Sequence, residues 1–496
     1  MTSNKYILAI DQGTSSTKTL IFDAAGIAIA KGVETLHTNY LDNGFVEQEP
    51  ETIFQNVLAS IKKCLTQFEE RGIDKNEIVA IGISNQRETF VVWDENGKPL
   101  HNAVVWQCKR SVHICEQLKQ QNLSATITQK TGLLIDPYFS ATKLIWLFQN
   151  NEAIKQAVQN GTAFFGTVDT WLLYKLTNGA EYATDYTNAS RTLLFNLHTL
   201  QWDEELISQF GLTGINLPTI KSSSAAFGTT DCNGIFKNKI PVTALIGDSH
   251  AAAFGEGCFE KGTAKATLGT GCSILMNIGY KPVQSQNGMV TTICWSIAGR
   301  IDYALEGVIV SCGATIEWLK NELNLFTDSA ATAAMASAVV DNGGVYLIPA
   351  FSGLGSPYWD MDRKASLTGM SFGTTKNHLV RAALESIPYQ IKDVIVAMEK
   401  GASVTLKELN ADGGITTNEF VIQFLADLLQ KNVATIGNPD VSALGAAYLA
   451  GLQSGVYLSI EQLQQLNKEK KYHQPSTETA SVNKGYDGWL KTIHNK

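Results

Sequence analysis

The chain has 496 residues, of which 44% are hydrophobic and 17% charged, and its formal net charge is −8. This length exceeds what one hydrophobic core usually supports, so roughly two to four domains are expected. The charged fraction lies below the roughly 25% of an average globular protein, which favours a compact enzyme over a solvated scaffold. The negative charge argues against general attraction to nucleic acid or to an anionic membrane.

The first residues, MTSNKYILAIDQ, form a short apolar run interrupted by Asp11. A secretory signal would need a longer apolar stretch and a cleavage site of small residues. A membrane span would need about 18 consecutive apolar residues, and none is expected here. Eight cysteines are scattered without a C-x-x-C pair. We expect them to be reduced and mostly buried, as in a cytoplasmic protein.

Strand-like and helical patterns alternate along the chain, which predicts an α/β architecture. A helix is expected over 51–72, where apolar residues recur at helical spacing up to a glycine. Two strands around a turn are predicted at 77–85 and 89–100. A second long helix is expected over 378–400, with a kink at Pro388.

Two segments about half a chain apart share one pattern: a strand, a turn of glycine and hydroxyl residues, and a second strand. They are ILAIDQGTSSTKTLIFD (7–23) and TAKATLGTGCSILMNIG (263–279). This similarity indicates a duplicated domain with a site between the halves, although two hairpins can also recur by chance. We predict domains at 1–254 and 255–496. The polar tail after residue 460 is expected to form a surface helix and an extended end.

The glycine–threonine turns point to phosphate, because glycine lets exposed backbone N–H groups approach phosphate oxygens. The sequence contains no Walker A motif, no protein-kinase H-R-D or D-F-G, and no dinucleotide fingerprint. A pair of phosphate-binding hairpins remains, in which Asp11 can orient Mg²⁺ through water and Lys18 can add positive charge. The alternative is an ordinary solvent-exposed hairpin.

Arg87 and Glu88 stand side by side directly after the strand predicted at 77–85. They could form an exposed ion pair, worth about 0–1 kcal/mol. They could also hold a hydroxylated substrate, because arginine donates hydrogen bonds and glutamate accepts them. Trp106 and Tyr138 could pack in the core or cover the C–H side of a sugar alcohol.

In ALIGDSHAAAFG, an apolar strand leads to Asp248 and a helix of small residues. The Asp248 carboxylate could cap that helix or accept a proton from an attacking hydroxyl group in phosphoryl transfer. Further on, LNADGGITTNEF places Gly413, Gly414 and Asn418 at a strand-to-helix junction. Such a helix start can receive the phosphate or ribose of a nucleotide, or Asn418 can cap the helix.

Together these stretches resemble the FGGY carbohydrate kinases, and within that family the glycerol kinase branch. The resemblance covers essentially the whole chain and rests on DQGTSSTK, SNQRET, VVWQCKR, IDPYFSATK, LGTGC, YALEG, GLGSPYWD and ALGAAYLAG. It implies two actin-like, ribonuclease-H-like domains with a catalytic cleft between them. It also implies phosphorylation of glycerol by MgATP to sn-glycerol 3-phosphate, by a protein that is often a homodimer or homotetramer.

The resemblance also implies roles for residues at matching positions. Asp248 matches the catalytic base, and the metal-side aspartates are Asp11 and Asp248. Residues that match polyol contacts are Arg87, Glu88, Trp106, Tyr138, Asp248, Ser249 and Ser273. Residues that match contacts to the nucleotide or its phosphates are Thr14, Ser15, Ser16, Lys18, Thr270, Gly313, Glu317, Gly414 and Asn418.

Four of these positions depart from the family pattern. Lys18 replaces a usual arginine, Ser249 a usual glutamine, and Ser273 a usual phenylalanine. The two serines imply a roomier, more polar pocket that could take a longer polyol or sugar of the erythritol, xylitol or xylulose type. Glu317 replaces a usual glutamine, and a buried acid near phosphates would repel them unless it is solvated or protonated.

Two other classes remain as rivals. An actin-like ATPase acting as a filament or chaperone would not need Arg87 and Glu88 beside aromatic residues. A catalytically dead regulator would not need Asp11 and Asp248.

Overall fold

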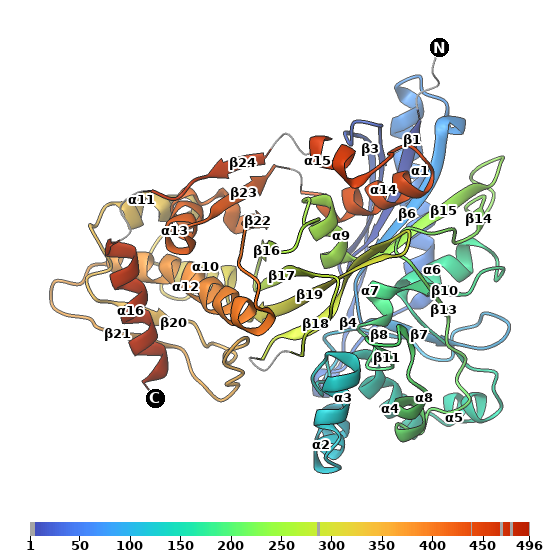
Figure 1. Cartoon of the computed structure of the whole chain (residues 1–496), viewed down its shortest axis with the longest axis horizontal. Helices are drawn as coiled ribbons and strands as arrows, with labels where there is room; N and C mark the ends of the chain where they lie inside the picture. The colour runs from blue at the N-terminus through green and yellow to red at the C-terminus, as the bar shows by residue number, and fades with distance from the viewer. Residues whose placement is uncertain (1–4, 285–287, 438, 467–469, 477–479, 496) are drawn as a thin grey trace.

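The computed structural model describes residues 5–284, 288–437, 439–466, 470–476 and 480–495. Two large β-sheets form the centres of the two halves of the molecule (Figure 1). The first has the order β14-β15-β6-β1-β2-β3. Its strands are β1 (Tyr6–Gln12), β2 (Ser16–Phe22), β3 (Ala28–Thr35), β6 (Ile78–Asn85), β14 (Thr229–Thr230) and β15 (Ile240–Gly247).

The second sheet has the order β18-β19-β17-β16-β22-β23-β24. Its strands are β16 (Thr263–Leu268), β17 (Cys272–Gly279), β18 (Val290–Ile297), β19 (Arg300–Ile309), β22 (Glu408–Asp412), β23 (Asn432–Ile436) and β24 (Lys470–His473).

The two sheets repeat one pairing scheme. β1 is antiparallel to β2 and parallel to β6, which is parallel to β15. In the same way, β16 is antiparallel to β17 and parallel to β22, which is parallel to β23. Both predicted hairpins and the α/β class are therefore confirmed, and the repeated scheme agrees with a duplicated domain.

Helices cover both faces of the first sheet, which explains its apolar central strands. Leu8 and Ile10 pack toward α1 (Pro50–Glu70), and Ile7 and Ala9 pack on the other side. That other side is covered by α14 (Val441–Gln453), although it comes from the far end of the chain. A Cβ atom at Gly82 would lie 2.4 Å from the Ala446 carbonyl oxygen, so glycine permits this close contact. α14 also packs against α9 (Asp248–Gly255).

The second sheet packs against α12 (Lys376–Ala402) and α13 (Glu419–Leu429), which confirms the long helix predicted around Pro388. The tail differs from the prediction. After α15 (Ile460–Leu466) and β24, the chain ends in α16 (Ala480–His494), not in an extended segment. Trp489 of α16 is fully buried against Tyr389, so the packing of one large ring holds this helix on the domain.

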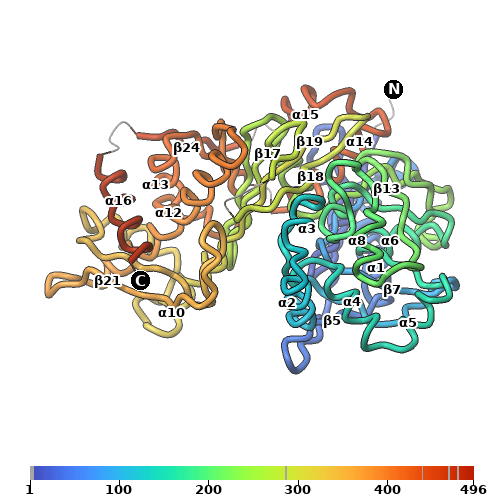
Figure 2. The backbone as a smooth tube through the Cα atoms, turned by 60° about the horizontal axis from the view of Figure 1, so that its bottom comes forward, coloured from blue at the N-terminus to red at the C-terminus, as the bar shows by residue number. Residues whose placement is uncertain are grey.

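A smaller sheet and several helices lie beside the first sheet (Figure 2). Its order is β4-β5-β8-β7-β9, with β4 (Asn39–Tyr40), β5 (Val46–Gln48), β7 (Phe90–Trp93), β8 (Ala103–Val104) and β9 (Phe164–Thr167). The helices are α2 (Val112–Gln120), α3 (Ser124–Thr131), α4 (Ser140–Asn150), α5 (Glu152–Gln159), α6 (Val168–Leu176), α7 (Tyr186–Ala189) and α8 (Glu204–Gln209).

The prediction that the cysteines are mostly buried is confirmed, because all eight are buried, and all are free thiols in this structure. Among the described residues, no helix is both long and apolar enough to cross a membrane. The domain boundary at 254/255 stays a prediction.

Candidate functional site

The first hairpin carries two opposite charges at its tip. Asp11 of β1 lies directly opposite Lys18 of β2 in the strand register. The Asp11 carboxylate is buried and accepts a hydrogen bond from Ser84 Oγ at 3.1 Å. Burial raises the pKa of Asp11 to about 6, against the opposing charge of Lys18. A buried carboxyl group with a raised pKa is a candidate for cation binding or proton transfer.

Lys18 also takes part in a shared ion pair. Its Nζ lies 3.1 Å from Asp440 Oδ1, and Lys31 Nζ lies 2.6 Å from Asp440 Oδ2. Asp440 directly precedes α14, so this carboxylate ties two strands of the first sheet to a segment from the end of the chain. The Lys18 ammonium is therefore not free in this structure.

The turn of the first hairpin is hydrogen-bonded to the ring of Trp106. Thr14 Oγ1 donates to Gln86 Oε1 at 3.0 Å and accepts from Trp106 Nε1 at 3.0 Å. Ser15 is exposed and Ser16 is half-buried. Trp106 meets Tyr138 edge to face, with 5.5 Å between ring centroids. The structure thus brings a residue predicted to bind phosphate, Thr14, into contact with Trp106, which is predicted to line the polyol site.

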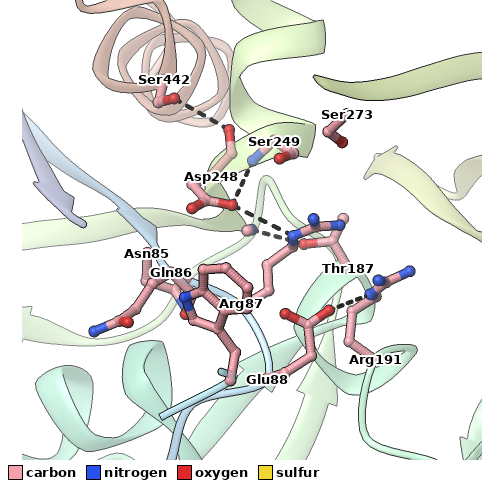
Figure 3. Close-up of polar contacts among 12 residues, drawn as sticks. Asn85, Gln86, Arg87, Glu88, Thr187, Arg191, Asp248, Ser249, Ser273 and Ser442 are labelled. Atoms are coloured by element: carbon pink, nitrogen blue, oxygen red, sulfur yellow. Dashed lines mark hydrogen bonds and ion pairs between the residues drawn. The ribbon is translucent and has the colours of Figure 1, made fainter. Parts of the chain in front are cut away.

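Arg87 and Glu88 are buried, so the alternative in which they form an exposed ion pair is excluded. Each pairs with a different residue: Arg87 Nε lies 3.3 Å from Asp248 Oδ1, and Glu88 Oε1 accepts from Arg191 Nε at 2.5 Å (Figure 3). Arg87 Nη1 is buried and has no hydrogen-bond partner among the described residues. Glu88 has a φ of +59°, a conformation that costs energy in a residue with a side chain and often marks a functional site.

Arg191 and Glu306 belong to this group and were not predicted. Glu306 Oε1 lies 2.8 Å from Arg87 Nη2, and Glu306 Oε2 lies 2.6 Å from Arg191 Nη1. Although burial opposes ionisation, the charges of Arg191 and Arg87 hold the pKa of Glu306 below its usual range. The sequence signal was one acid inside the apolar stretch YALEGVIV, which gains meaning only when its partners are known.

Asp248 begins α9 and faces two sides. Its Oδ1 accepts the backbone N–H of Ser249 at 2.6 Å, but the N-cap of α9 is Gly247 and no side chain caps this helix, so the capping alternative for Asp248 does not hold. The same oxygen approaches Arg87, and the side chain keeps 36% of its surface exposed. Ser273 Oγ donates to Glu306 Oε1 at 3.3 Å. Ser249 and Ser273 therefore lie at the margin of the charged group (Figure 3).

A cavity of about 560 Å³ adjoins Asp248 on its other side. Residues from both halves line it, among them Asp248, Ser249, Thr267, Asp412, Gly414 and Ser442. Gly413 has a φ of +94°, and a Cβ atom there would lie 2.5 Å from the Leu268 carbonyl oxygen. This glycine lets the turn after β22 approach the end of β16. Lys265 also lines the cavity, is 2% exposed, and was not predicted.

The remaining nucleotide-side residues lie outside the lining of this cavity. Thr270 is at the tip of the second hairpin, where its carbonyl oxygen accepts the N–H of Cys312 at 2.9 Å, next to Gly313 at the start of α10 (Gly313–Asn321). Glu317 is exposed, so water solvates its charge and it is not the buried acid that would repel the phosphates. Asn418 caps α13 by accepting the N–H of Val421, as the capping alternative expected.

The residues present fit Mg²⁺ held largely through water and phosphate. Among the described residues, no group of three or more His, Cys, Asp or Glu side chains could enclose a metal ion. Mg²⁺ usually keeps several waters and takes only one or two carboxylates when it is bound with phosphates. Besides burial, the charge of the nearby Asp248 raises the pKa of Asp11, so the two carboxylates together provide such a pair.

Comparison with known proteins agrees with this arrangement. Residues 6–255 match the FGGY family of carbohydrate kinases, N-terminal domain, and residues 264–454 match the C-terminal domain of that family. The chain is 44% identical over 492 residues to a glycerol kinase of Carboxydothermus hydrogenoformans, covering 99% of this chain and 98% of that protein. It is also 44% identical over 493 residues to a glycerol kinase of Halothermothrix orenii, with the same coverage.

Solved structures give the same result. A crystal structure of Plasmodium falciparum glycerol kinase with ADP superposes with a TM-score of 0.93 at 34% identity, covering 99% of this chain and 98% of that one. A gluconate kinase of Lactobacillus acidophilus superposes with a TM-score of 0.89 at 22% identity over the same share, which supports the fold alone.

Proposed function

The chain belongs to the FGGY family of carbohydrate kinases, and from this premise we propose that it transfers the γ-phosphoryl group of ATP to glycerol. One observation carries the proposal. The Asp248 carboxylate both contacts the buried Arg87 and lines the cavity shared by the two halves. A base in that position can meet a polyol on one side and a nucleotide on the other. The identity of 44% with proteins named glycerol kinase supports glycerol as the substrate.

On the polyol side, the side chains suit a molecule with hydroxyl groups on one edge and C–H groups on the other. The buried Arg87 Nη1 needs a hydrogen-bond acceptor, which a glycerol hydroxyl oxygen provides. Glu88 accepts from a second hydroxyl group. Trp106 and Tyr138 cover the C–H side, so the third hydroxyl is left facing Asp248.

In the reaction, Asp248 accepts the proton of that terminal hydroxyl group as its oxygen attacks the γ-phosphorus in line. A new O–P bond forms, and the bond from the γ-phosphorus to the β-phosphate oxygen breaks to release ADP. Thr14, Ser15 and Ser16 donate to the phosphates from the first hairpin, and Thr270 and Gly313 from the second. Asp11 and Asp248 would hold Mg²⁺, and that ion would supply positive charge to neutralise the phosphates.

The second domain provides the nucleotide contacts at Gly414, Asn418 and the exposed Glu317, with Lys18 on the phosphate side. We place the protein in the cytoplasm as a homodimer or homotetramer. The eight buried, free thiols support a reducing compartment.

A second candidate is a kinase for a longer polyol or sugar of the erythritol, xylitol or xylulose type. The short side chains of Ser249 and Ser273 at the margin of the charged group favour it (Figure 3). A coupled assay of ADP release at equal MgATP, with glycerol, erythritol, xylitol and xylulose, decides between the two. We expect glycerol to have by far the highest kcat/KM. A higher value for any other member would reject glycerol as the preferred substrate.

A further inference from the structure

Five charged side chains of alternating sign form one continuous row in the middle of the molecule. In order they are Asp248, Arg87, Glu306, Arg191 and Glu88. Neighbouring members approach to between 2.5 and 3.3 Å. Apart from Asp248, all members of the row are almost completely buried.

The middle member of the row, Glu306, comes from the second sheet, whereas its two arginine partners come from the first half of the chain. Arg87 follows β6 of the first sheet, and Arg191 follows α7, whereas Glu306 lies on β19 of the second sheet. In both views β18 and β19 lie between the two halves (Figure 1, Figure 2). The row is therefore complete only when the two halves are together.

We infer that Glu306 is a positioning residue that keeps Asp248 and Glu88 available to the polyol by binding the two arginines from the second sheet. This inference rests on the proposed function. Each arginine has two carboxylate partners in the row. Because Glu306 takes part of the charge of each arginine, Asp248 and Glu88 stay able to accept hydrogen bonds from the substrate. Without Glu306, Arg87 is left with Asp248 and Arg191 with Glu88. The polyol hydroxyl groups then compete with a guanidinium for each carboxylate.

The chain offers a matched control on the same strand. Asp302 is as buried as Glu306 and also lies on β19, but its partners are Arg300 and Asn277 of the second sheet. D302N therefore removes a buried charge without touching the row. A merely structural role for Glu306 would make E306Q and D302N alike.

The experiment compares wild type, E306Q and D302N by calorimetric titration with polyol alone and with ADP alone. The polyol is the panel member with the highest kcat/KM. A preference for xylitol, for example, would reject glycerol as the substrate and leave this test intact. For E306Q we expect the polyol Kd to rise about 10- to 100-fold, as loss of charged hydrogen bonds predicts. The ADP Kd should stay within about twofold, and D302N should match wild type for both ligands.

Steady-state kinetics should show the same split, with the KM for polyol raised and the KM for MgATP unchanged. An unchanged polyol Kd in E306Q, or equal losses of polyol and ADP binding, would overturn the inference. If E306Q does not fold, E306D decides, because it keeps the charge on a shorter side chain that cannot reach both arginines equally. Weaker polyol binding with normal ADP binding supports the inference, and wild-type polyol binding in E306D rejects it.

Discussion

The two hairpins share a backbone scheme and differ in charge. In the first, Asp11 lies opposite Lys18, and Asp440 and Lys31 are close by. In the second, the strand pairs nearest the turn are Leu268 with Cys272 and Thr267 with Ser273. One topology therefore carries two chemistries: charged residues beside the first turn, for cation and phosphate, and uncharged residues beside the second turn, whose backbone is held at close range. The charge of the second hairpin, Lys265, lies farther from its turn.

Close packing takes the place of charge at the second turn. The turn at Gly413 comes so near the end of β16 that no side chain fits, and it lines the cavity next to Thr267. Repeated domains can thus keep the strand pairing while the ionisable groups nearest the turn are placed in one hairpin only. Charge changes should therefore matter beside the turn of the first hairpin, and steric changes beside the turn of the second.

The largest effect is expected at Asp248, which lies between the two hairpins. D248N keeps the size of the side chain and removes the proton acceptor. We expect kcat to fall by about 10²- to 10⁴-fold, with the ADP Kd, measured by calorimetry, nearly unchanged. Near-normal turnover in this variant would exclude Asp248 as the base.

The next effect concerns the stability of the first hairpin. Asp11 has a pKa of about 6 in the native protein against an ordinary value of 3.8, so native protein binds more protons between these values. The free energy of unfolding therefore falls as pH rises from 3.8 to about 6, and the full cost is present at higher pH. D11N removes this cost and should stabilise the metal-free protein at pH 7 by up to about 3 kcal/mol.

Urea denaturation at pH 5 and pH 7 checks this, since the gain should be smaller at the lower pH. T267V on the second hairpin is the counterpart, because Thr267 Oγ1 is buried without a hydrogen-bond partner among the described residues. It should change stability by less than about 1 kcal/mol, equally at both pH values. Equal pH dependence in the two variants would contradict the charge difference between the hairpins.

Steric fit in the second half is tested by two adjacent glycines. G413A adds a methyl group at a left-handed backbone position and against the Leu268 carbonyl oxygen, so we expect a loss of about 1–3 kcal/mol in stability. G414A is the matched control, because among the described residues no atom other than those of its chain neighbours lies within 4 Å of its Cβ position. Thermal unfolding of both variants should separate them, and equal unfolding temperatures would show that Gly413 is not required sterically.

Local patterns in the sequence predicted local structure well. The hairpins, α1 and α12 follow from the spacing of apolar residues, which is a property of neighbours in the chain. The helix α16 was missed because few of its residues are buried, and what holds it is Trp489 against Tyr389 of α12. That contact joins residues far apart in sequence.

The same limit applies to the site. Arg87, Glu88 and Asp248 stand out because each follows a strand, where side chains often reach a cleft. Glu306 is one of three charged residues on β19 and follows no strand end, and Arg191 follows a short helix. Their roles depend on pairing across the two halves, which no local pattern encodes. Long-range ion pairs were therefore the part of the site that sequence could not provide.

The smallest effect is expected at Lys31, which shares Asp440 with Lys18. K31M removes one of the two ammonium groups that share the Asp440 carboxylate. Asp440 then binds Lys18 more firmly and keeps it from the phosphates. Because Lys31 is 39% exposed, the change should be modest, about a two- to fivefold rise in the ADP Kd. The adenosine Kd should not change, since adenosine has no phosphate. K63M is the control, because Lys63 of α1 pairs at 2.8 Å with Glu34, which lies on the same strand as Lys31. An equal effect of both variants on the ADP Kd would reject the role of Lys31.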